Sequence, residues 1–378
     1  MKKEMGKKIC IIRSNPVKPD SRVEKEAWSL AKAGYDIHIL AWDRDTDVDE
    51  MEGFVNVANM DIPITWLGHK ASYGEGLKNL WSYLAFQVHM RKWLMRHDFD
   101  VIHACDFDTA FFSRSVVKRK KERFVFDIFD FLYSEPCNFM QRCVKRAQLH
   151  LVNYSDATII CTEERKEQIK GSNPKRLIVI HNTPFETQAS NETFFEKSND
   201  KVYIAYVGVL QDYRLLKETA EVISGLNNVE FHVGGFGKYD TYFSNMSKKF
   251  SNIKFYGRLP YNQTLALEKN CDIMLAIYDP TIANHKLAAP NKFYESLMLG
   301  KPVIMVKDTG MSRIIETNNI GVLIEYSKSG LLAGINQLIA QKHCWKEMGE
   351  RMMHLYSDQY NWNIMEGKLL NLYKDIFD

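Results

Sequence analysis

The chain has 378 residues, of which 45% are hydrophobic and 26% charged, and its formal net charge is +3. This length suggests two domains, and the composition gives each half enough apolar residues for an ordinary core. A net charge this small argues against nucleic acid as a partner.

The cysteines and the N-terminal residues restrict the class of protein further. Seven cysteines are scattered without a CxxC pair, which argues against a disulfide framework and favours a reducing, cytoplasmic setting. There is no HExxH motif and no Cys/His cluster, so no structural metal is expected. The first apolar stretch ends at Arg13, too short for a signal peptide, and no run approaches the roughly 20 apolar residues of a spanning helix. We therefore expect a cytoplasmic protein, either soluble or peripheral at a membrane.

Short apolar runs alternate with amphipathic stretches in the first half, a pattern typical of parallel βα units. A helix at 21–34, closed by Gly34, separates the first two expected strands. The polar, aperiodic stretch 183–200 interrupts the pattern and predicts a linker at 186–200, which follows a first domain at 1–185. The strands expected before it are KICIIRS, DIHILAW, FDVIHAC, RFVFDIF, DATIIC and RLIVIHN.

The same alternation restarts after the linker and predicts a second domain at 201–359. Beyond Ser327 the sequence is helical, and an amphipathic helix at about 360–378 either packs on its own domain or crosses back to the first. Two successive parallel sheets predict an α/β protein with two doubly wound, Rossmann-like domains facing each other across a ligand cleft. The strands expected here are KVYIAYVG, VEFHVGG, IKFYG, DIMLAIY, KPVIMV and GVLIEY.

The stretch PNKFYESLMLGKPVIM predicts a helix from about Pro290 to Leu299 with an anion site at its start. Lys292 in the first turn opposes the helix dipole unless an anion lies nearby. Glu295 shares a face with Lys292 and Asn291, where its carboxylate could accept hydrogen bonds from a ribose diol. The alternative is a solvated Lys–Glu pair of small energy.

Charged residues also follow several strands. Arg214 begins the helix after the first strand of the second half, where a guanidinium can bind a diphosphate bidentately, and Lys217 lies one turn further on. A solvated first turn is the alternative. In the first half Asp106, Asp127 and Asp130 stand at strand ends, where they could orient substrate hydroxyls or form Asx-turns and helix caps.

Two segments of the first half, 76–99 and 114–124, combine aromatic and basic residues. Such clusters suit an anionic bilayer surface. The alternative is a helix that covers a sheet and has a solvated basic end.

The βα layout and several motifs together resemble family 4 of the GT-B glycosyltransferases. These are retaining, nucleotide-sugar-dependent enzymes of bacterial polysaccharide and glycolipid assembly. The resemblance covers nearly the whole chain, and the segment that ends in ESLMLGKPVI is its most specific part. The other matching segments are DVIHACDFDTAFFS, IVIHNTPF, YVGVLQDYRLL and NIKFYGRLP.

The resemblance implies roles for individual residues. Glu295 would bind the donor ribose, while Arg214 and Lys292 would act on the diphosphate as catalytic residues. Asp106 and Asp130 would be catalytic residues on the acceptor side. The other expected donor-binding residues lie at turns and helix starts of the second domain: Pro290, Asn291, Gly257, Arg258, Leu259, Gly208 and Lys217.

Three positions depart from the family pattern. Leu287 stands where the first of two paired glutamates is expected, Phe129 replaces a histidine, and Val209 replaces an arginine after the opening glycine of the second domain. The nucleotide half of the site is therefore better supported than the sugar half.

The resemblance implies transfer of a hexosyl or N-acetylhexosaminyl group from a UDP- or GDP-linked donor to a glycan or lipid-linked acceptor. Configuration would be retained, and neither a metal nor another cofactor would be required. A role in surface polysaccharide or glycolipid synthesis would place the protein on the inner face of the cell membrane. The alternatives are a nucleotide-sugar epimerase of the same fold and a non-catalytic nucleotide-binding partner in an assembly complex.

Overall fold

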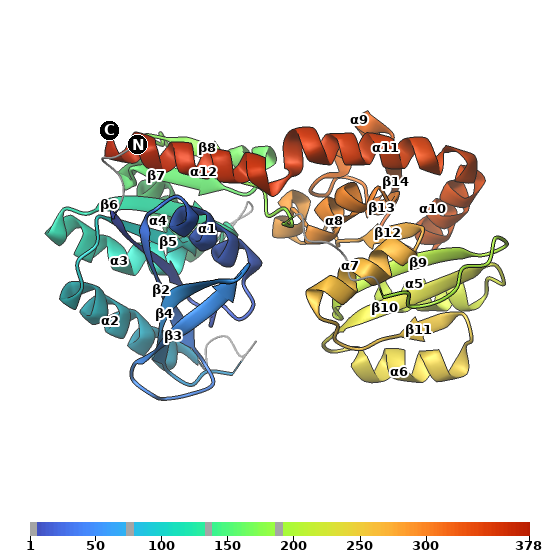
Figure 1. Cartoon of the computed structure of the whole chain (residues 1–378), viewed down its shortest axis with the longest axis horizontal. Helices are drawn as coiled ribbons and strands as arrows, with labels where there is room; N and C mark the ends of the chain where they lie inside the picture. The colour runs from blue at the N-terminus through green and yellow to red at the C-terminus, as the bar shows by residue number, and fades with distance from the viewer. Residues whose placement is uncertain (1–5, 73–78, 133–137, 186–191) are drawn as a thin grey trace. The chain divides into compact units, whose positions relative to one another are not determined.

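The computed structural model describes residues 6–72, 79–132, 138–185 and 192–378. The chain divides into two compact units, the first made of residues 1–181 and 363–378 and the second of residues 182–362. Each unit is an α/β layer structure built on one sheet (Figure 1).

The first unit contains an eight-stranded sheet in the order β3-β4-β2-β1-β5-β6-β7-β8. All neighbouring strands pair in parallel except β3 and β4, which are antiparallel. The strands are β1 (Lys8–Arg13), β2 (Asp36–Asp43), β3 (Met51–Val57), β4 (Met60–Gly68), β5 (Val101–Cys105), β6 (Arg123–Ile128), β7 (Ala157–Ile160) and β8 (Leu177–Val179).

Successive residues of each strand point to opposite faces of this sheet, and both faces are mostly apolar. Helices therefore cover both faces. Cys10 and Ile12 of β1 pack in one core with residues of the helices α2, α3 and α4. The side chain of His103 points to the other face, where it meets the C-terminal helix α12. The helices are α1 (Ser21–Lys32), α2 (Leu80–Arg96), α3 (Asp106–Lys120), α4 (Phe139–Tyr154), the short 3₁₀ helix η2 (Glu163–Glu167) and α12 (Trp362–Phe377).

The hairpin of β3 and β4 was not predicted from the sequence. Its turn places Ala58 and Asn59 at positive φ, 48° and 64°, as in the two-residue turns that match the twist of a hairpin. Neither residue is glycine, so the usual turn signal is missing.

The second unit contains a six-stranded, all-parallel sheet in the order β11-β10-β9-β12-β13-β14. Because β9 lies between β10 and β12, the loops that follow these strands meet at one edge of the sheet. The strands are β9 (Val202–Val209), β10 (Val229–Phe236), β11 (Ile253–Phe255), β12 (Ile273–Ala276), β13 (Val303–Val306) and β14 (Gly321–Ile324).

The helices of the second unit again cover both faces of its sheet. One core joins the sheet to α5, α6 and α10, and another joins it to α8, α9 and α11. The helices are α5 (Leu216–Ser224), α6 (Asp240–Lys249), α7 (Tyr261–Asn270), α8 (Asn291–Leu299), α9 (Ser312–Asn318), α10 (Lys328–Ala340) and α11 (Trp345–Leu355), with short 3₁₀ helices η3 (Ala283–Leu287) and η4 (Lys342–Cys344) and a π-helix η5 (Tyr356–Tyr360).

The C-terminal helix α12 packs on the first unit, so the crossing back of the chain is confirmed (Figure 1). Tyr373 donates to or accepts from His103 at 2.8 Å, and the amide of His181 lies 3.2 Å from the sulfur of Met365. Tyr35 stacks against Phe377 with the ring centroids 6.0 Å apart. Helix α12 thus completes one face of the first sheet.

The segment expected as a linker lies partly outside the described residues, which exclude 186–191. Its remainder, 192–200, is counted with the second unit, where Phe195 packs against Tyr203 and Cys271. The six cysteines in the described part of the chain are free, and Cys137 lies outside it. Within that same part, no helix combines the length and hydrophobicity needed to cross a bilayer.

Candidate functional site

Lys292 lies at the start of α8, which runs from Asn291 to Leu299 and ends at Gly300 in the left-handed conformation (φ 62°). Its ammonium lies 4.6 Å from the ring centroid of Tyr206 on β9. A Cβ added to Gly208 would stand 2.5 Å from Lys292 Nζ. Glycine at position 208 therefore leaves the space that the ammonium occupies at the end of β9.

The surroundings of Lys292 favour its charge. Burial acts against the charged form, but Tyr206, Tyr278 and two carboxylates, Glu295 and Glu268, outweigh it, so the pKa of Lys292 is raised. The half-buried ammonium is thus held as a cation at the strand end.

Glu295 lies one turn after Lys292 on α8 and is only 6% exposed. The hydroxyl of Tyr261, the first residue of α7, donates a hydrogen bond to it. Asn291, which shares this face in sequence, is exposed and accepts a hydrogen bond from Asn182 at 3.1 Å. The buried carboxylate is therefore held between two helices rather than in a solvated surface pair.

Arg214 does not begin α5 as predicted, because the helix starts at Leu216 after two residues at positive φ, Tyr213 and Leu215. Its guanidinium instead lies 3.6 Å from the ring centroid of Tyr278, and its Nη1 is 3.3 Å from Nε2 of His285. Tyr278 also raises the pKa of Lys292, so the same tyrosine acts on both cations.

Lys217 lies on α5, with its ammonium over a different pair of rings. Its Nζ is 4.5 Å from the ring centroid of Tyr239 and 5.3 Å from that of Tyr242. The contacts of Lys217 are therefore with α6 and the loop before it, apart from the Tyr278 ring that Arg214 contacts.

The segment Gly257–Leu259 packs beside the end of β10. The amide of Gly235 donates to the carbonyl of Gly257 at 2.7 Å, and the guanidinium of Arg258 lies 4.6 Å from the ring centroid of Phe236. A side chain on Gly235 would collide with the carbonyl oxygen of Gly208, so glycine is needed for this close approach. The Gly-Gly pair in VEFHVGGF thus allows close strand packing beside the expected donor-binding segment Gly257–Leu259.

Four large hydrophobic side chains at or after the ends of strands of this sheet are 44–54% exposed: Val209, Tyr213, Phe236 and Tyr261. Exposed aromatic residues beside cations form a surface that can stack a nucleobase and bind a phosphate. The strand ends of the second unit therefore place exposed apolar side chains near arginine and lysine side chains.

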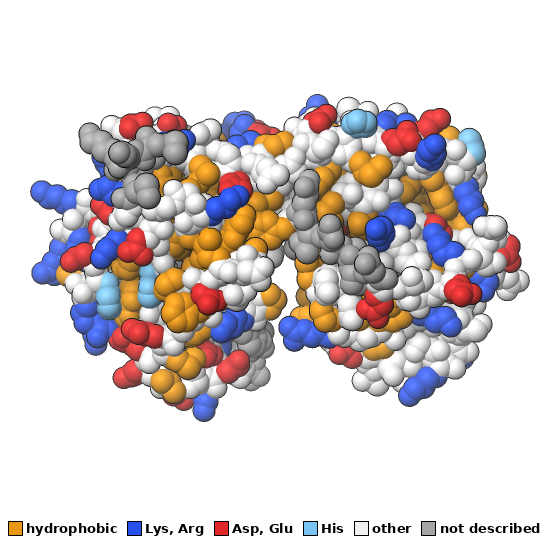
Figure 2. All heavy atoms as spheres, viewed as in Figure 1, with side chains coloured by type: hydrophobic (Ala, Val, Ile, Leu, Met, Phe, Trp, Pro, Cys, Tyr) orange, Lys and Arg blue, Asp and Glu red, His pale blue; other side chains and the backbone are white. Residues whose placement is uncertain are grey.

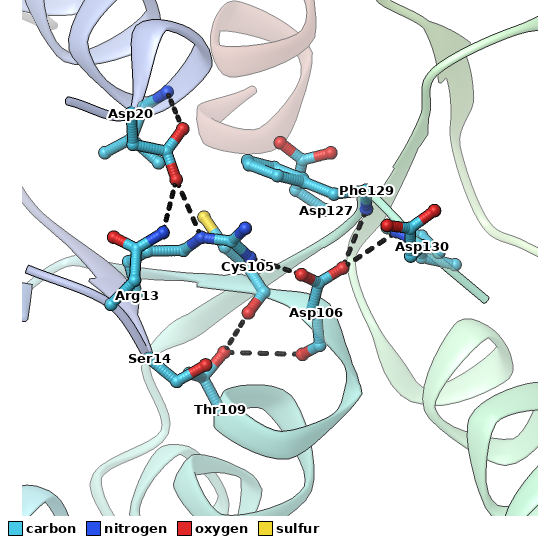
Figure 3. A network of polar contacts seen from close by, with 12 residues as sticks. Arg13, Ser14, Asp20, Cys105, Asp106, Thr109, Asp127, Phe129 and Asp130 are labelled. Atoms are coloured by element: carbon cyan, nitrogen blue, oxygen red, sulfur yellow. Dashed lines mark hydrogen bonds and ion pairs between the residues drawn. The ribbon is translucent and has the colours of Figure 1, made fainter. Parts of the chain in front are cut away.

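In the first unit, Asp106 follows β5 and begins α3 with φ 68°, a conformation that a side chain disfavours (Figure 3). Its carboxylate pairs with Arg13 and accepts the amides of Phe129 and Asp130 at 2.9 and 3.0 Å. Burial raises the pKa of Asp106 to about 6, although Arg13 acts in the opposite direction. The Asp106 carboxylate is thus bound to the backbone amide of Asp130, the other predicted acceptor-side residue.

Phe129 and Asp130 both contact arginines that the sequence did not single out. The guanidinium groups of Arg13 and Arg22 lie 4.2 and 4.8 Å from the Phe129 ring centroid. Arg165, itself 4% exposed, donates to Asp130 Oδ1 at 3.0 Å. The aromatic ring at position 129 is therefore a platform for two cations.

Asp127, the third predicted strand-end carboxylate, belongs to a buried ion-pair network. Its oxygens accept from Nη2 and Nε of Arg22 at 2.7 and 3.2 Å, and His103 Nε2 lies 3.4 Å away. His103, Cys105 and Asp127 have the ligand atoms of a metal site, a cluster not expected from the sequence. Because Arg22 already occupies both carboxylate oxygens, the geometry fits an ion pair.

Sequence reasoning missed the aromatic and histidine residues that surround the two cations. Tyr206 lies on β9, and Tyr278 and His285 lie in the segment after β12. No local sequence pattern indicated that these side chains would contact a cation. The only available signal was their position just inside or after a strand of the second sheet.

Two family models match the chain. The model of glycosyltransferase family 4 matches residues 22–183, and that of the glycosyl transferases group 1 matches residues 188–354. In a comparison with curated protein sequences, none matches.

Several solved structures share the fold at low sequence identity. Sucrose-phosphate synthase from Thermosynechococcus elongatus has a TM-score of 0.72 at 13% identity, over 98% of this chain and 99% of that one. Anabaena HepE in complex with UDP-glucose has a TM-score of 0.69 at 12% identity, over 97% and 99%. WaaG, a glycosyltransferase involved in lipopolysaccharide biosynthesis, has a TM-score of 0.63 at 14% identity, over 96% and 98%.

Proposed function

The chain belongs to the family 4, group 1 glycosyltransferases with the GT-B fold, and on that premise we propose which part of the reaction each unit performs. The donor is a UDP- or GDP-linked hexose or N-acetylhexosamine, bound by the second unit. The acceptor is a glycan or lipid-linked sugar of a bacterial surface polysaccharide or glycolipid, and the anomeric configuration is retained. Solved relatives with UDP-glucose and UDP-2-fluoro glucose bound support the choice of donor class.

The observation that carries the proposal is the position of Lys292 against Gly208, with Glu295 one turn further along α8. Lys292, Arg214 and the free amides at the start of α8 neutralise the diphosphate as it leaves. Glu295 accepts hydrogen bonds from the ribose hydroxyls. The proposal includes no cofactor.

Asp106 and Asp130 act on the acceptor side in this proposal. Arg13 and two backbone amides fix the Asp106 carboxylate, and Arg165 fixes that of Asp130. A donor phosphate oxygen takes the proton of the acceptor hydroxyl in a front-face displacement, while these fixed carboxylates orient the acceptor.

The ribose role of Glu295 is tested by calorimetry of UDP and GDP binding. Glu295→Ala should lower the affinity for the nucleotide that the wild type prefers by about 10- to 150-fold, because a hydrogen bond to a charged group contributes about 1.5–3 kcal/mol. The matched control is Glu316→Ala, which removes an exposed glutamate from α9 of the same unit. Equal affinity of Glu295→Ala and the wild type would refute the assignment.

Turnover separates the proposed enzyme from a nucleotide-binding partner without activity. The protein is incubated with a panel of nucleotide sugars and a membrane extract, and both transfer and hydrolysis are measured. Transfer supports the proposal, while nucleotide binding without either reaction would contradict it. Release of an epimerised sugar in the absence of an acceptor would support the epimerase instead.

We also propose that the first unit binds an anionic membrane surface through α2. Trp81, Val88 and Met95 lie on one exposed stripe of this helix, with Arg91 and Lys92 beside them. Figure 2 shows that the surface over α2 mixes hydrophobic, basic, acidic and histidine side chains. Hydrophobic side chains flanked by cations favour the interface of an anionic bilayer.

Liposome flotation tests this surface. The wild type should float with phosphatidylglycerol vesicles and less with phosphatidylcholine vesicles, and Trp81→Ser with Val88→Ser should abolish flotation. The control is Met353→Ser, which removes a 47% exposed methionine from the second unit. A wild type that does not float with anionic lipid would remove the proposal.

A further inference from the structure

The face of α7 that meets α8 carries two polar residues two turns apart, Tyr261 and Glu268. Tyr261 donates its hydroxyl to Glu295, as described above. Glu268 is fully buried, and neither of its carboxylate oxygens has a hydrogen-bond partner among the described residues. A buried acid without a donor is costly when ionised, so its presence beside a predicted nucleotide site needs an explanation.

The charged side chains that face Glu268 lie on α8, and a thiol lies just after the end of α7. Glu295 and Lys292 of α8 act on it directly, and Cys271 at the end of α7 lies close enough to be affected by it. Burial and the like charge of Glu295 raise the pKa of Glu268 well above its usual range, while Lys292 acts in the opposite direction. The Tyr206 ring on β9 also lies near Lys292, with its centroid 4.6 Å from the ammonium. Burial and Glu295 thus both favour the neutral acid, and Lys292 opposes them.

The charge balance of this cluster depends on that proton. With Glu268 neutral, Lys292 and Glu295 balance each other, and the site can accept an anionic diphosphate. With Glu268 ionised, a second carboxylate stands beside Glu295 and partly cancels the cation. A bound diphosphate would in turn favour the protonated acid, because like charges disfavour ionisation.

We propose that Glu268 is a positioning residue for nucleotide binding. While Glu268 holds a proton, it supports the binding of the nucleotide by Lys292 and Glu295. Once ionised, it weakens that binding. The inference rests on the proposed function, since it concerns the same nucleotide site. It assigns to this enzyme a nucleotide affinity that falls as pH rises, with uptake of up to one proton for each nucleotide bound.

Calorimetry of UDP-glucose binding to the full chain between pH 5.5 and 8.5 tests the proposal. Both phosphates of this ligand are esterified, so the ligand itself does not take up a proton in this range. Wild-type affinity should fall with rising pH by up to tenfold per pH unit. Glu268→Gln, a neutral residue of the same shape, should keep the affinity of the wild type at low pH and abolish the dependence. Buffers with different ionisation enthalpies report the number of protons taken up.

A second group could produce the same sign of pH dependence. His285 is hydrogen-bonded to Arg214, and its protonation would also favour an anion. His285→Gln is therefore measured in parallel, and the proposal expects it to retain the pH slope. A slope that persists in Glu268→Gln and disappears in His285→Gln would overturn the proposal.

The remaining outcomes separate this inference from the proposed function. Wild-type binding without proton uptake would overturn the inference alone, and this measurement does not depend on the folding of any variant. A Glu295→Gln variant that binds UDP-glucose as the wild type does would overturn the ribose role of Glu295 and the inference with it.

Discussion

Replacement of Gly208 by alanine should weaken nucleotide binding by displacing Lys292. The added Cβ would stand 2.5 Å from Nζ and 3.2 Å from Cε of Lys292, whereas non-bonded heavy atoms prefer about 3.5–4.0 Å. The ammonium must therefore retreat by about 1 Å from the strand end, because it is the flexible partner of this contact.

The expected magnitude follows from the lost interaction between the ammonium and a phosphate. A hydrogen bond to a charged group contributes about 1.5–3 kcal/mol, so UDP affinity should fall by about 10- to 150-fold. Alanine at a φ of 154° also strains the backbone, which should cost the fold about 1 kcal/mol. Gly171→Ala is the control for strain, since Gly171 has φ 91° and no atom within 4 Å of an added Cβ.

A double-mutant cycle with Lys292→Met decides whether the effect passes through the ammonium. UDP affinity is measured by calorimetry for the wild type, both single variants and the pair. Because the pair in contact shares one interaction, Gly208→Ala should cost little in the Lys292→Met background. An equal loss of affinity in both backgrounds would refute the reasoning, and so would an unchanged affinity of Gly208→Ala.

Three further predictions concern the first unit. Asp106→Ala should lower kcat for transfer by about 100-fold through misplacement of the acceptor, with UDP affinity unchanged in calorimetry; a matching loss of UDP affinity would contradict this. Burial lowers the pKa of His181 to about 3, and the unfolded side chain titrates near 6.5, so stability should be lost as pH falls from about 6.5 toward 3, by up to about 1.4 kcal/mol per pH unit. His181→Gln should reduce that slope in urea unfolding at several pH values. Tyr373→Phe removes the 2.8 Å hydrogen bond to buried His103 and should destabilise the first unit by about 1–3 kcal/mol in the same assay, while an unchanged midpoint would show that the bond contributes nothing.

The helix α8 shows how far local sequence reaches. Its N-cap at Pro290, its C-cap at Gly300 and the shared face of Lys292 and Glu295 depend on backbone preferences and on the helical period, which neighbouring residues fix. The parallel strands were likewise predictable, because runs buried on both faces are apolar throughout. The hairpin of β3 and β4 was missed because its turn residues, Ala58 and Asn59, do not include the glycine that usually indicates such a turn.

The surroundings of the site residues were not predictable in this way. Lys292 rests on Gly208, Arg214 stacks on Tyr278, and Asp106 pairs with Arg13 across 93 positions of sequence. These partners meet because strands distant in the chain become neighbours in a sheet, and a single sequence does not state that order.

The sequence by itself determined two α/β units, most of their helices and strands, and a cation and a carboxylate placed one turn apart on one helix. The tertiary structure alone decided which aromatic rings hold the cations, which amides hold Asp106, and that Glu268 is buried beside Glu295. The physical reason is that propensity and periodicity act over a few residues, whereas desolvation and charge pairing depend on what the folded chain places within a few ångströms.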